Sequence, residues 1–222
     1  LLPFTYTRPL VELRAGGLNI SEKWSLLFGH AGSWITQDYL QSLYPAKLKA
    51  DNIFISGDII PDKTLKNELI ALSLGYGLKD ENGIIAWRGV EFSNDFNPKG
   101  TKWIFRNDPA TRIKNTWDLF RLAPTEILQD IDLLNSKVSG FPLPNHVQCT
   151  NPEKVYVASD VILEHCILNT SDGPIYIDQG VHVMEGAMLR GPLFLGANTV
   201  VKMGAKIYGG TAIGPGCKVG GE

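Results

Sequence analysis

The sequence predicts an α/β domain over residues 1–134 and a solenoid of short β-strands over residues 155–222, joined by a linker over residues 135–154. The first observation behind this fold class is a six-residue repeat, in which a large aliphatic residue recurs without a break. The positions are Ile177, Val183, Leu189, Leu195, Val201, Ile207, Ile213 and Val219. The second is a register of small or modest side chains four residues further on, with glycine at many of the turns. The third is the order of strand and helix patterns before residue 135, which favours a mixed or parallel sheet.

The six-residue period excludes the two commonest regular structures for this stretch. An amphipathic helix needs apolar residues every three or four positions, and a half-buried strand alternates them. A period of six predicts strands that each turn a corner after a few residues, so that both inward registers stack into a continuous core. The motif Leu195-Gly196-Ala197-Asn198-Thr199-Val200 resembles the hexapeptide-repeat family, which implies a left-handed parallel β-helix with three hexapeptides per coil. Leu163 and Ile177 are fourteen residues apart rather than twelve, which predicts a bulge at residues 171–174.

The first part alternates short apolar runs with helical patterns. Residues 53–56 form an apolar run that ends in Gly57-Asp58, which predicts a buried strand followed by a turn. Residues 64–74 place leucines at helical spacing, with Asp62 or Thr64 available as the N-cap. Further strands are predicted at residues 84–87 and 102–105, and further helices at residues 115–122 and 125–134.

Composition and charge place the chain among globular proteins. Of its 222 residues, 44% are hydrophobic and 20% are charged, and the formal net charge of −2 gives no electrostatic case for nucleic acid or an anionic membrane as a partner. No apolar run approaches the roughly 20 residues that span a bilayer. The three cysteines show no CxxC spacing, so they indicate neither a zinc site nor a disulfide framework. A reducing cytoplasm is therefore the expected compartment.

The N-terminal stretch resembles the opening of the sugar-phosphate nucleotidyltransferases. In that family a glycine-rich loop is followed by Leu-x-Pro-Leu-Thr, then by Pro-Lys-Pro, then by a Gly-Gly or Gly-Lys turn. Residues 2–5 fall on the second element, Pro9 on the first proline of the third, and Gly16-Gly17 on the last. The resemblance implies that Gly16 and Gly17 contact nucleotide or sugar phosphates. It also implies that the phosphate-cradling loop lies before Leu1, so the chain is expected to be part of a longer protein.

The family's lysine in this stretch is replaced by Leu10. That lysine steadies the phosphates, so other cations have to take over its role. The resemblance places Arg8, Arg14 and Lys23 nearby as phosphate-binding candidates, and Arg14 and Lys23 also as catalytic candidates. The alternative is that all three are solvated surface charges.

Asp58 is the candidate metal ligand. It follows a predicted buried strand as Ser-Gly-Asp and precedes a helix, which resembles the Gly-Asp element whose aspartate holds the catalytic Mg²⁺ in the same family. Attack of a sugar-1-phosphate oxygen on an α-phosphorus builds charge that a carboxylate-held Mg²⁺ neutralises. The resemblance therefore implies a catalytic and metal-binding role for Asp58. A Gly-Asp turn also ends strands for structural reasons alone.

The solenoid resembles acyltransferases that bind acetyl-CoA between the subunits of a homotrimer and use a histidine as general base. His182 is the candidate base, with His165 as a second possibility, because an imidazole titrates near neutral pH. The alternative is that each is an exposed polar residue at a corner. The solenoid is expected to continue beyond Glu222, where another base could lie.

The two parts together resemble the bifunctional N-acetylglucosamine-1-phosphate uridylyltransferases/glucosamine-1-phosphate acetyltransferases and their relatives, with an abridged Rossmann-like nucleotidyltransferase domain. The expected function is transfer from a nucleoside triphosphate to a sugar-1-phosphate, with Mg²⁺ as cofactor and a homotrimer built through the solenoid. One alternative is an acetyltransferase that uses acetyl-CoA and whose first domain is degenerate. A non-catalytic trimeric scaffold or sensor is the other.

Overall fold

The computed structural model describes the chain except for residues 94–95, 97, 135–141 and 221–222. The chain forms two compact units, which are described separately. Unit 1 contains Leu1–Leu13 and Asn19–Thr116, and unit 2 contains Arg14–Leu18 and Trp117–Glu222.

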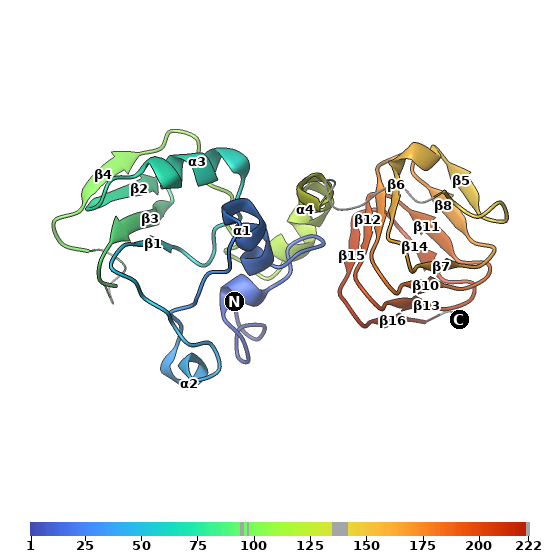
Figure 1. Cartoon of the computed structure of the whole chain (residues 1–222), viewed down its shortest axis with the longest axis horizontal. Coiled ribbons are helices and arrows are strands. Elements are labelled where there is room, and N and C mark those ends of the chain that lie inside the picture. Colours follow the sequence, from blue (N-terminus) through green and yellow to red (C-terminus); the bar gives the residue numbers. More distant parts are fainter. Residues whose placement is uncertain (94–95, 97, 135–141, 221–222) are drawn as a thin grey trace. The chain divides into compact units, whose positions relative to one another are not determined.

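Unit 1 is built on a mixed four-stranded sheet of order β1-β3-β2-β4 among its described residues (Figure 1). Strand β3 pairs antiparallel with both β1 and β2, and β4 is parallel to β2. The strands are β1 (Asn52–Ile55), β2 (Tyr76–Asp80), β3 (Gly83–Gly89) and β4 (Lys102–Phe105). The helices are η1 (Leu10–Glu12), α1 (Ile20–Phe28), α2 (Asp38–Gln41) and α3 (Lys63–Ala71). The mixed α/β character predicted for the first part is therefore confirmed.

Local sequence explains most of these elements. Helix α3 begins where the Asp62 carboxylate accepts a hydrogen bond from the Leu65 amide, and it buries Leu65 and Leu69. Helix α1 begins with a capping box between Asn19 and Glu22. The predicted strands at 53–56, 84–87 and 102–105 match β1, β3 and β4 to within a few residues. Helix α1 and strand β2 were not predicted.

Unit 2 is a parallel β-solenoid of about four turns, in line with a left-handed β-helix. Figure 1 shows its strands stacked as successive coils, which form three four-stranded parallel sheets among the described residues. Their orders are β16-β13-β10-β7, β14-β11-β8-β5 and β15-β12-β9-β6. The strands are β5 (Gln148–Thr150), β6 (Val155–Val157), β7 (Ile162–Leu163), β8 (Ile167–Asn169), β9 (Ile175–Ile177), β10 (His182–Val183), β11 (Met188–Arg190), β12 (Leu193–Leu195), β13 (Val200–Val201), β14 (Lys206–Ile207), β15 (Thr211–Ile213) and β16 (Lys218–Val219). A short 3₁₀ helix, η3, covers Pro152–Lys154.

Both predicted inward registers form the core of the solenoid. The aliphatic register is buried from Ile177 to Ile207, and the register four residues on is buried from Val181 to Ala205. Burial decreases in the last described coil, over which no further described coil is stacked. Cys217, which continues the predicted inward register of small or modest side chains, is exposed there.

The predicted bulge at residues 171–174 is confirmed. It separates β8 from β9, and the Asp172 carboxylate accepts a hydrogen bond of 2.6 Å from Arg190. The predicted linker over 135–154 differs in extent from the structure, because β5 already pairs with β8 inside it. Residues 135–141 of that linker lie outside the described residues.

Helix α4 (Asp118–Leu134) belongs to unit 2. Two helices were predicted here, at 115–122 and 125–134, and the structure joins them into one with Pro124 inside. Its Ile127 and Ile131 pack against Tyr176 and Phe194 of the solenoid. This apolar contact holds the helix on the sheet that contains β9 and β12.

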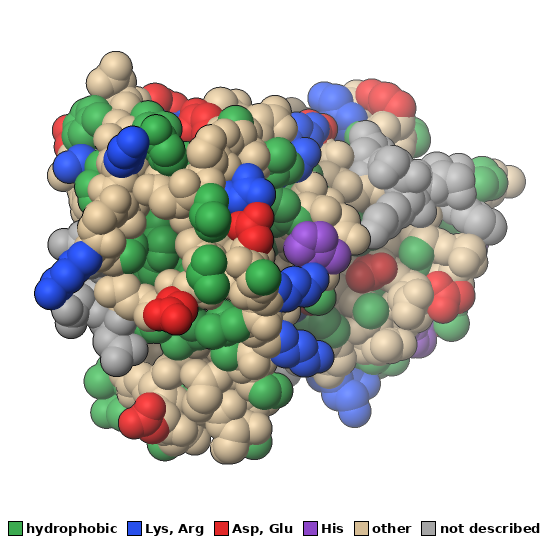
Figure 2. All heavy atoms as spheres, turned by 60° about the vertical axis from the view of Figure 1, so that its left-hand side comes forward, with side chains coloured by type: hydrophobic (Ala, Val, Ile, Leu, Met, Phe, Trp, Pro, Cys, Tyr) green, Lys and Arg blue, Asp and Glu red, His purple; other side chains and the backbone are tan. Residues whose placement is uncertain are grey.

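The surface is mixed in character. Figure 2 shows a face that carries both basic and acidic side chains, with many hydrophobic ones exposed between them. In the part of the chain that the structure describes, none of the helices has the length and apolar composition needed to cross a membrane.

Candidate functional site

The candidate site in unit 1 is centred on the turn that follows β1. Ser56 continues the sheet through an amide hydrogen bond to the Ile85 carbonyl, and its hydroxyl donates to Asp58 Oδ1 at 2.5 Å. The backbone of Ile59 then forms an antiparallel bridge with Arg112, and the Ile113 amide donates to the Asp58 carbonyl. Both sides of the Asp58 turn are therefore fixed by backbone hydrogen bonds.

Arg112 connects Asp58 to a second, buried carboxylate. Its Nη1 atom lies 3.2 Å from Asp58 Oδ2 and 3.4 Å from Oδ1, and its Nη2 atom lies 3.3 Å from Asp80 Oδ1. Nη2 also donates to the carbonyls of Gly83 and Ile84 at 3.2 and 3.1 Å. The side chain of Arg112 is 6% exposed, that of Asp80 is 0% exposed, and that of Asp58 is 23% exposed. Only the Asp58 end of this three-residue cluster therefore reaches solvent.

Asp80 anchors the cluster to the backbone. Burial raises the pKa of Asp80, but hydrogen bonds from the Ala110 and Asn82 amides and the adjacent Arg112 guanidinium outweigh it and leave the pKa below its ordinary value. The two amides donate at 2.9 and 2.8 Å. The carboxylate is therefore ionised at neutral pH and holds Arg112 in place.

The donor set at Asp58 fits a Mg²⁺ ion that arrives with phosphates. Mg²⁺ prefers hard oxygen ligands and is commonly held by one or two carboxylates, with water and substrate phosphates completing its octahedron. The partly exposed Asp58 carboxylate supplies such an oxygen, and the two bonds to Arg112 leave lone pairs free. Among the described residues no group of three or more His, Cys, Asp or Glu side chains could hold a metal by itself.

The structure brings helix η1, which directly follows Pro9, next to this turn. A Cβ atom on Gly57 would lie 3.4 Å from Val11 Cγ1, so helix η1 with Leu10 packs against the Gly57-Asp58 turn. Arg8 precedes η1 and is exposed. Lys23 lies on α1 and is 1% exposed, so its side chain is not a solvated surface charge. The phosphate-binding roles of Arg8 and Lys23 stay predictions.

Arg14, Gly16 and Gly17 belong to unit 2, where they pack against α4 and the solenoid. Asp130 of α4 accepts hydrogen bonds from the Gly17 and Leu18 amides at 2.8 and 3.1 Å. Arg14 donates to the Gly17 carbonyl. Gly16 has φ = 87°, a left-handed conformation that favours glycine. The Gly17 amide is thus already paired with a carboxylate, and phosphate binding at this turn stays a prediction.

Replacing Gly17 by Ala is expected to lower the free energy of unfolding by about 1–3 kcal/mol, the range typical of overpacking. The added Cβ would lie 2.2 Å from a ring carbon of Phe194, which has little room to move because its ring stacks on Tyr176. Urea denaturation measures the effect, with Gly220→Ala as control because a Cβ there meets none of the described atoms within 4 Å. Unchanged stability combined with weaker nucleotide binding would instead assign this turn to phosphate recognition.

A second candidate lies on the solenoid, where His182 of β10 contacts Glu164. Its Nε2 atom is 2.7 Å from Glu164 Oε2, and both side chains are partly exposed. A carboxylate in this position orients the imidazole ring. His165 occupies an exposed turn with φ = 37°, and its ring centre is 4.8 Å from that of His146. Of the two histidine candidates, His182 is the one with a carboxylate partner among the residues that the structure describes.

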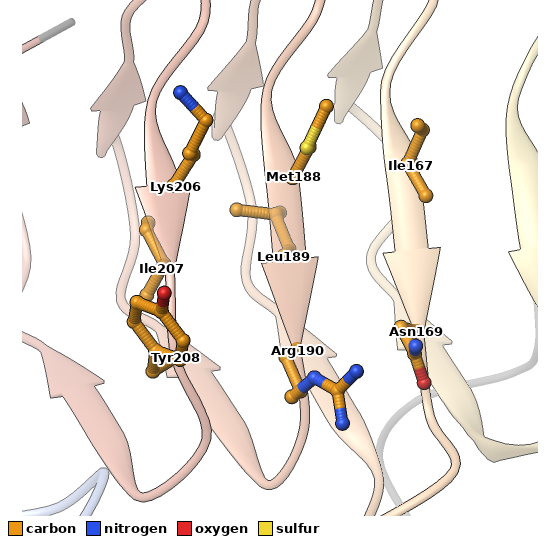
Figure 3. Close-up of a pocket in the computed structure, with 8 residues that line it drawn as sticks. All are labelled: Ile167, Asn169, Met188, Leu189, Arg190, Lys206, Ile207 and Tyr208. Atoms are coloured by element: carbon orange, nitrogen blue, oxygen red, sulfur yellow. The ribbon is translucent and has the colours of Figure 1, made fainter.

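A shallow pocket lies on another sheet of the solenoid, formed by β8, β11 and β14 (Figure 3). Strand pairing places Ile167, Met188 and Lys206 in one row. Asn169 and Arg190 lie in a parallel row, and Tyr208 follows β14. The pocket thus combines two cations with apolar side chains. It lies on a different sheet from His182.

Sequence reasoning missed Arg112, Asp80 and Glu164. Arg112 is 54 positions from Asp58, and no local pattern connects them. Glu164 could have been found from the spacing of the repeat. The two-residue bulge lengthens the coil between β7 and β10 to 20 residues, so His182 pairs with Ile162. Glu164 is only two positions from Ile162.

Residues 1–139 match a family model described as sugar nucleotidyl transferase. The match covers more than half of the chain and includes all of the residues in the Asp58 cluster. No match was found among curated proteins or among solved structures.

Proposed function

Because the chain belongs to the family of sugar nucleotidyl transferases, we propose that it forms a nucleotide-sugar from a nucleoside triphosphate and a sugar-1-phosphate. In this reaction a phosphate oxygen of the sugar-1-phosphate bonds to the α-phosphorus. The bond from that phosphorus to the oxygen bridging to the β-phosphate breaks, and pyrophosphate leaves. The observation that carries the proposal is the partly exposed Asp58 carboxylate, fixed in a turn that packs against η1, the helix that follows Pro9.

In this proposal Asp58 is the metal ligand and the residues around it hold it in place. A bound Mg²⁺ would neutralise charge that develops on the phosphates. Ser56 donates to one carboxylate oxygen and Arg112 contacts both, which fixes the orientation of Asp58 before substrate arrives. Such preorganisation removes the cost of ordering the ligand at the moment of reaction.

Arg8, Arg14 and Lys23 are proposed to compensate for Leu10. Arg8 is the first candidate for a direct phosphate contact because its side chain is exposed and precedes η1. A guanidinium binds phosphate oxygens in pairs, which a leucine cannot do. Lys23 is proposed to act from within α1 and Arg14 from the Gly16-Gly17 turn.

Pyrophosphate release tests the proposal. The protein with Mg²⁺ is combined with UTP, dTTP, CTP, GTP or ATP and with glucose-, glucosamine- or N-acetylglucosamine-1-phosphate. We expect turnover with at least one pair and none when Mg²⁺ is chelated. A folded protein that turns over none of the pairs would refute it.

The three free cysteines support a reducing compartment, the cytoplasm, for the activity.

The contact between His182 and Glu164 favours a second candidate activity, acetyl transfer. We propose that a homotrimer would carry it out. An imidazole oriented by a carboxylate can take a proton from a sugar amine or hydroxyl as it attacks the acetyl carbonyl of acetyl-CoA, and the thiol of CoA leaves.

The expected result is thiol release from acetyl-CoA with glucosamine-1-phosphate, by a species with the mass of three chains in light scattering. His182→Asn should reduce this rate by about a hundredfold or more, whereas His165→Asn should leave it nearly unchanged. Equal effects of the two substitutions would exclude His182 as the base. A monomeric mass would exclude the trimer.

A further inference from the structure

We propose that Arg112 is the positioning residue of Asp58 and also its built-in counter-ion. In the free protein it keeps a divalent cation from binding tightly at Asp58, so the cation binds there only together with the phosphates of a nucleotide. The proposal rests on the proposed function for the identity of the nucleotide. The ion pair itself is a property of the free protein.

Arg112 is held so that it cannot easily leave Asp58. One end of its guanidinium is fixed by Asp80 and by the carbonyls of Gly83 and Ile84. Asp80 is in turn fixed by two backbone amides. A guanidinium keeps its proton at every physiological pH, so the positive charge beside Asp58 is permanent.

The cluster is not arranged for stability alone. Arg112 Nε is buried and has no hydrogen-bond partner in the part of the chain that the structure describes. The contacts from Arg112 to Asp58, at 3.2 and 3.4 Å, are also longer than usual charge-assisted bonds. Buried ion pairs of this kind are often no more stabilising than apolar residues of the same volume. These features are better explained by a need for a fixed positive charge behind Asp58.

A divalent cation at Asp58 would meet this charge at close range. Each unit of like charge within a few ångströms weakens cation binding strongly in a partly buried site. Within the described cluster one carboxylate faces solvent, and the Arg112 guanidinium lies directly beside it. A nucleoside triphosphate brings several negative charges and its own oxygen ligands, so the complete complex overcomes the repulsion.

Mn²⁺ binding to the protein without nucleotide tests the proposal, because Mn²⁺ prefers the same oxygen ligands and electron paramagnetic resonance counts its free form. The informative variant is Arg112→Met/Asp80→Asn, which removes both buried charges and leaves the net charge of the cluster unchanged. We expect it to bind Mn²⁺ about tenfold more tightly than the natural protein or better. Adding Asp58→Asn should abolish the gain.

Arg112→Lys and Arg88→Met serve as controls. The lysine variant keeps a cation beside Asp58, so its Mn²⁺ binding should stay weak. Arg88 of strand β3 pairs with the exposed Asp51, outside the Asp58 cluster. Replacing Arg88 should therefore leave Mn²⁺ binding unchanged. Circular dichroism identifies any variant that fails to fold.

Tight, Asp58-dependent binding of Mn²⁺ to the natural protein would overturn the proposal, as would a double variant with unaltered affinity. Its failure is distinguishable from that of the proposed function, because this measurement uses neither nucleotide nor sugar. If the natural protein shows turnover but the double variant binds Mn²⁺ no more tightly, only the role of Arg112 is refuted. If the double variant binds Mn²⁺ more tightly as expected but the natural protein shows no turnover, only the nucleotidyl transfer is refuted.

Discussion

Replacing Asp58 by Asn is expected to lower the rate of pyrophosphate release by about a hundredfold to a thousandfold, the loss typical when one charge-stabilising group is removed from an active site. The amide has nearly the shape of the carboxylate but lacks the negative charge that binds Mg²⁺. The fold should tolerate the change, because Asp58 is partly exposed and Arg112 keeps its contacts with Asp80. The measurement is kcat for the nucleotide and sugar-phosphate pair that the natural protein uses.

Asp51→Asn is the matched control for this substitution. Asp51 is also an aspartate of unit 1 paired with an arginine, at 2.6 Å from Arg88, but it is exposed and lies outside the Asp58 cluster. Its rate should stay within about twofold of the natural value, since surface substitutions away from a site have small effects. A rate for Asp58→Asn within tenfold of the natural one would show that the carboxylate does not hold the metal.

The solenoid was predictable because its signal is local and repeats. Eight aliphatic residues spaced six positions apart determine the strand length, the corners and the core of the solenoid. The structure buries the members of this register from Ile177 to Ile207. The α/β part gave weaker signals. Gly77 lies inside β2, where a Cβ would be 2.3 Å from the ring of Trp103, so this position depends on a residue 26 positions away. A close approach between distant segments has no local pattern.

The same reason limits what the sequence indicates about the site. Asp58 could be singled out because it follows a strand in a motif of adjacent residues. Arg112 and Asp80 could not, since they come from other segments of unit 1. The backbone bridge at Ile59 brings Arg112 to Asp58, and Asp80 is connected to Asp58 through Arg112. The Gly16-Gly17 turn was assigned to phosphates by resemblance, and the structure adds its hydrogen bond to Asp130.

Asp80→Asn is the substitution expected to destabilise unit 1 most. Removing one partner of a buried ion pair typically costs about 3–5 kcal/mol, because the other charge stays buried without compensation. Among the described residues, Arg112 would then keep only the partly exposed Asp58 as a charged partner. The two backbone amides that donate hydrogen bonds to Asp80 would also lose a charged acceptor. Urea denaturation followed by tryptophan fluorescence measures the loss.

The double variant Arg112→Met/Asp80→Asn provides the test of this mechanism. Because it removes both buried charges, it should recover a large part of the stability that Asp80→Asn loses. Asp51→Asn, at an exposed pair, should leave the denaturation midpoint almost unchanged. A double variant less stable than Asp80→Asn would show that packing of the Arg112 side chain, and not its charge, matters at this position.

The pH dependence of stability follows from the lowered pKa of Asp80. Burial opposes the shift, and the Ala110 and Asn82 amides together with Arg112 produce it. A carboxyl whose pKa is lower in the folded state stabilises the protein above its unfolded pKa, about 3.9, and this contribution is lost as the pH falls through the lower folded value. The natural protein should therefore lose stability below about pH 4, and more steeply than Asp80→Asn. The exposed Asp51, whose pKa is also lowered by Arg88, titrates in both proteins, so its contribution cancels in the difference. Parallel curves for the two proteins over this range would mean that Asp80 is not held as a carboxylate by Arg112 and the two amides.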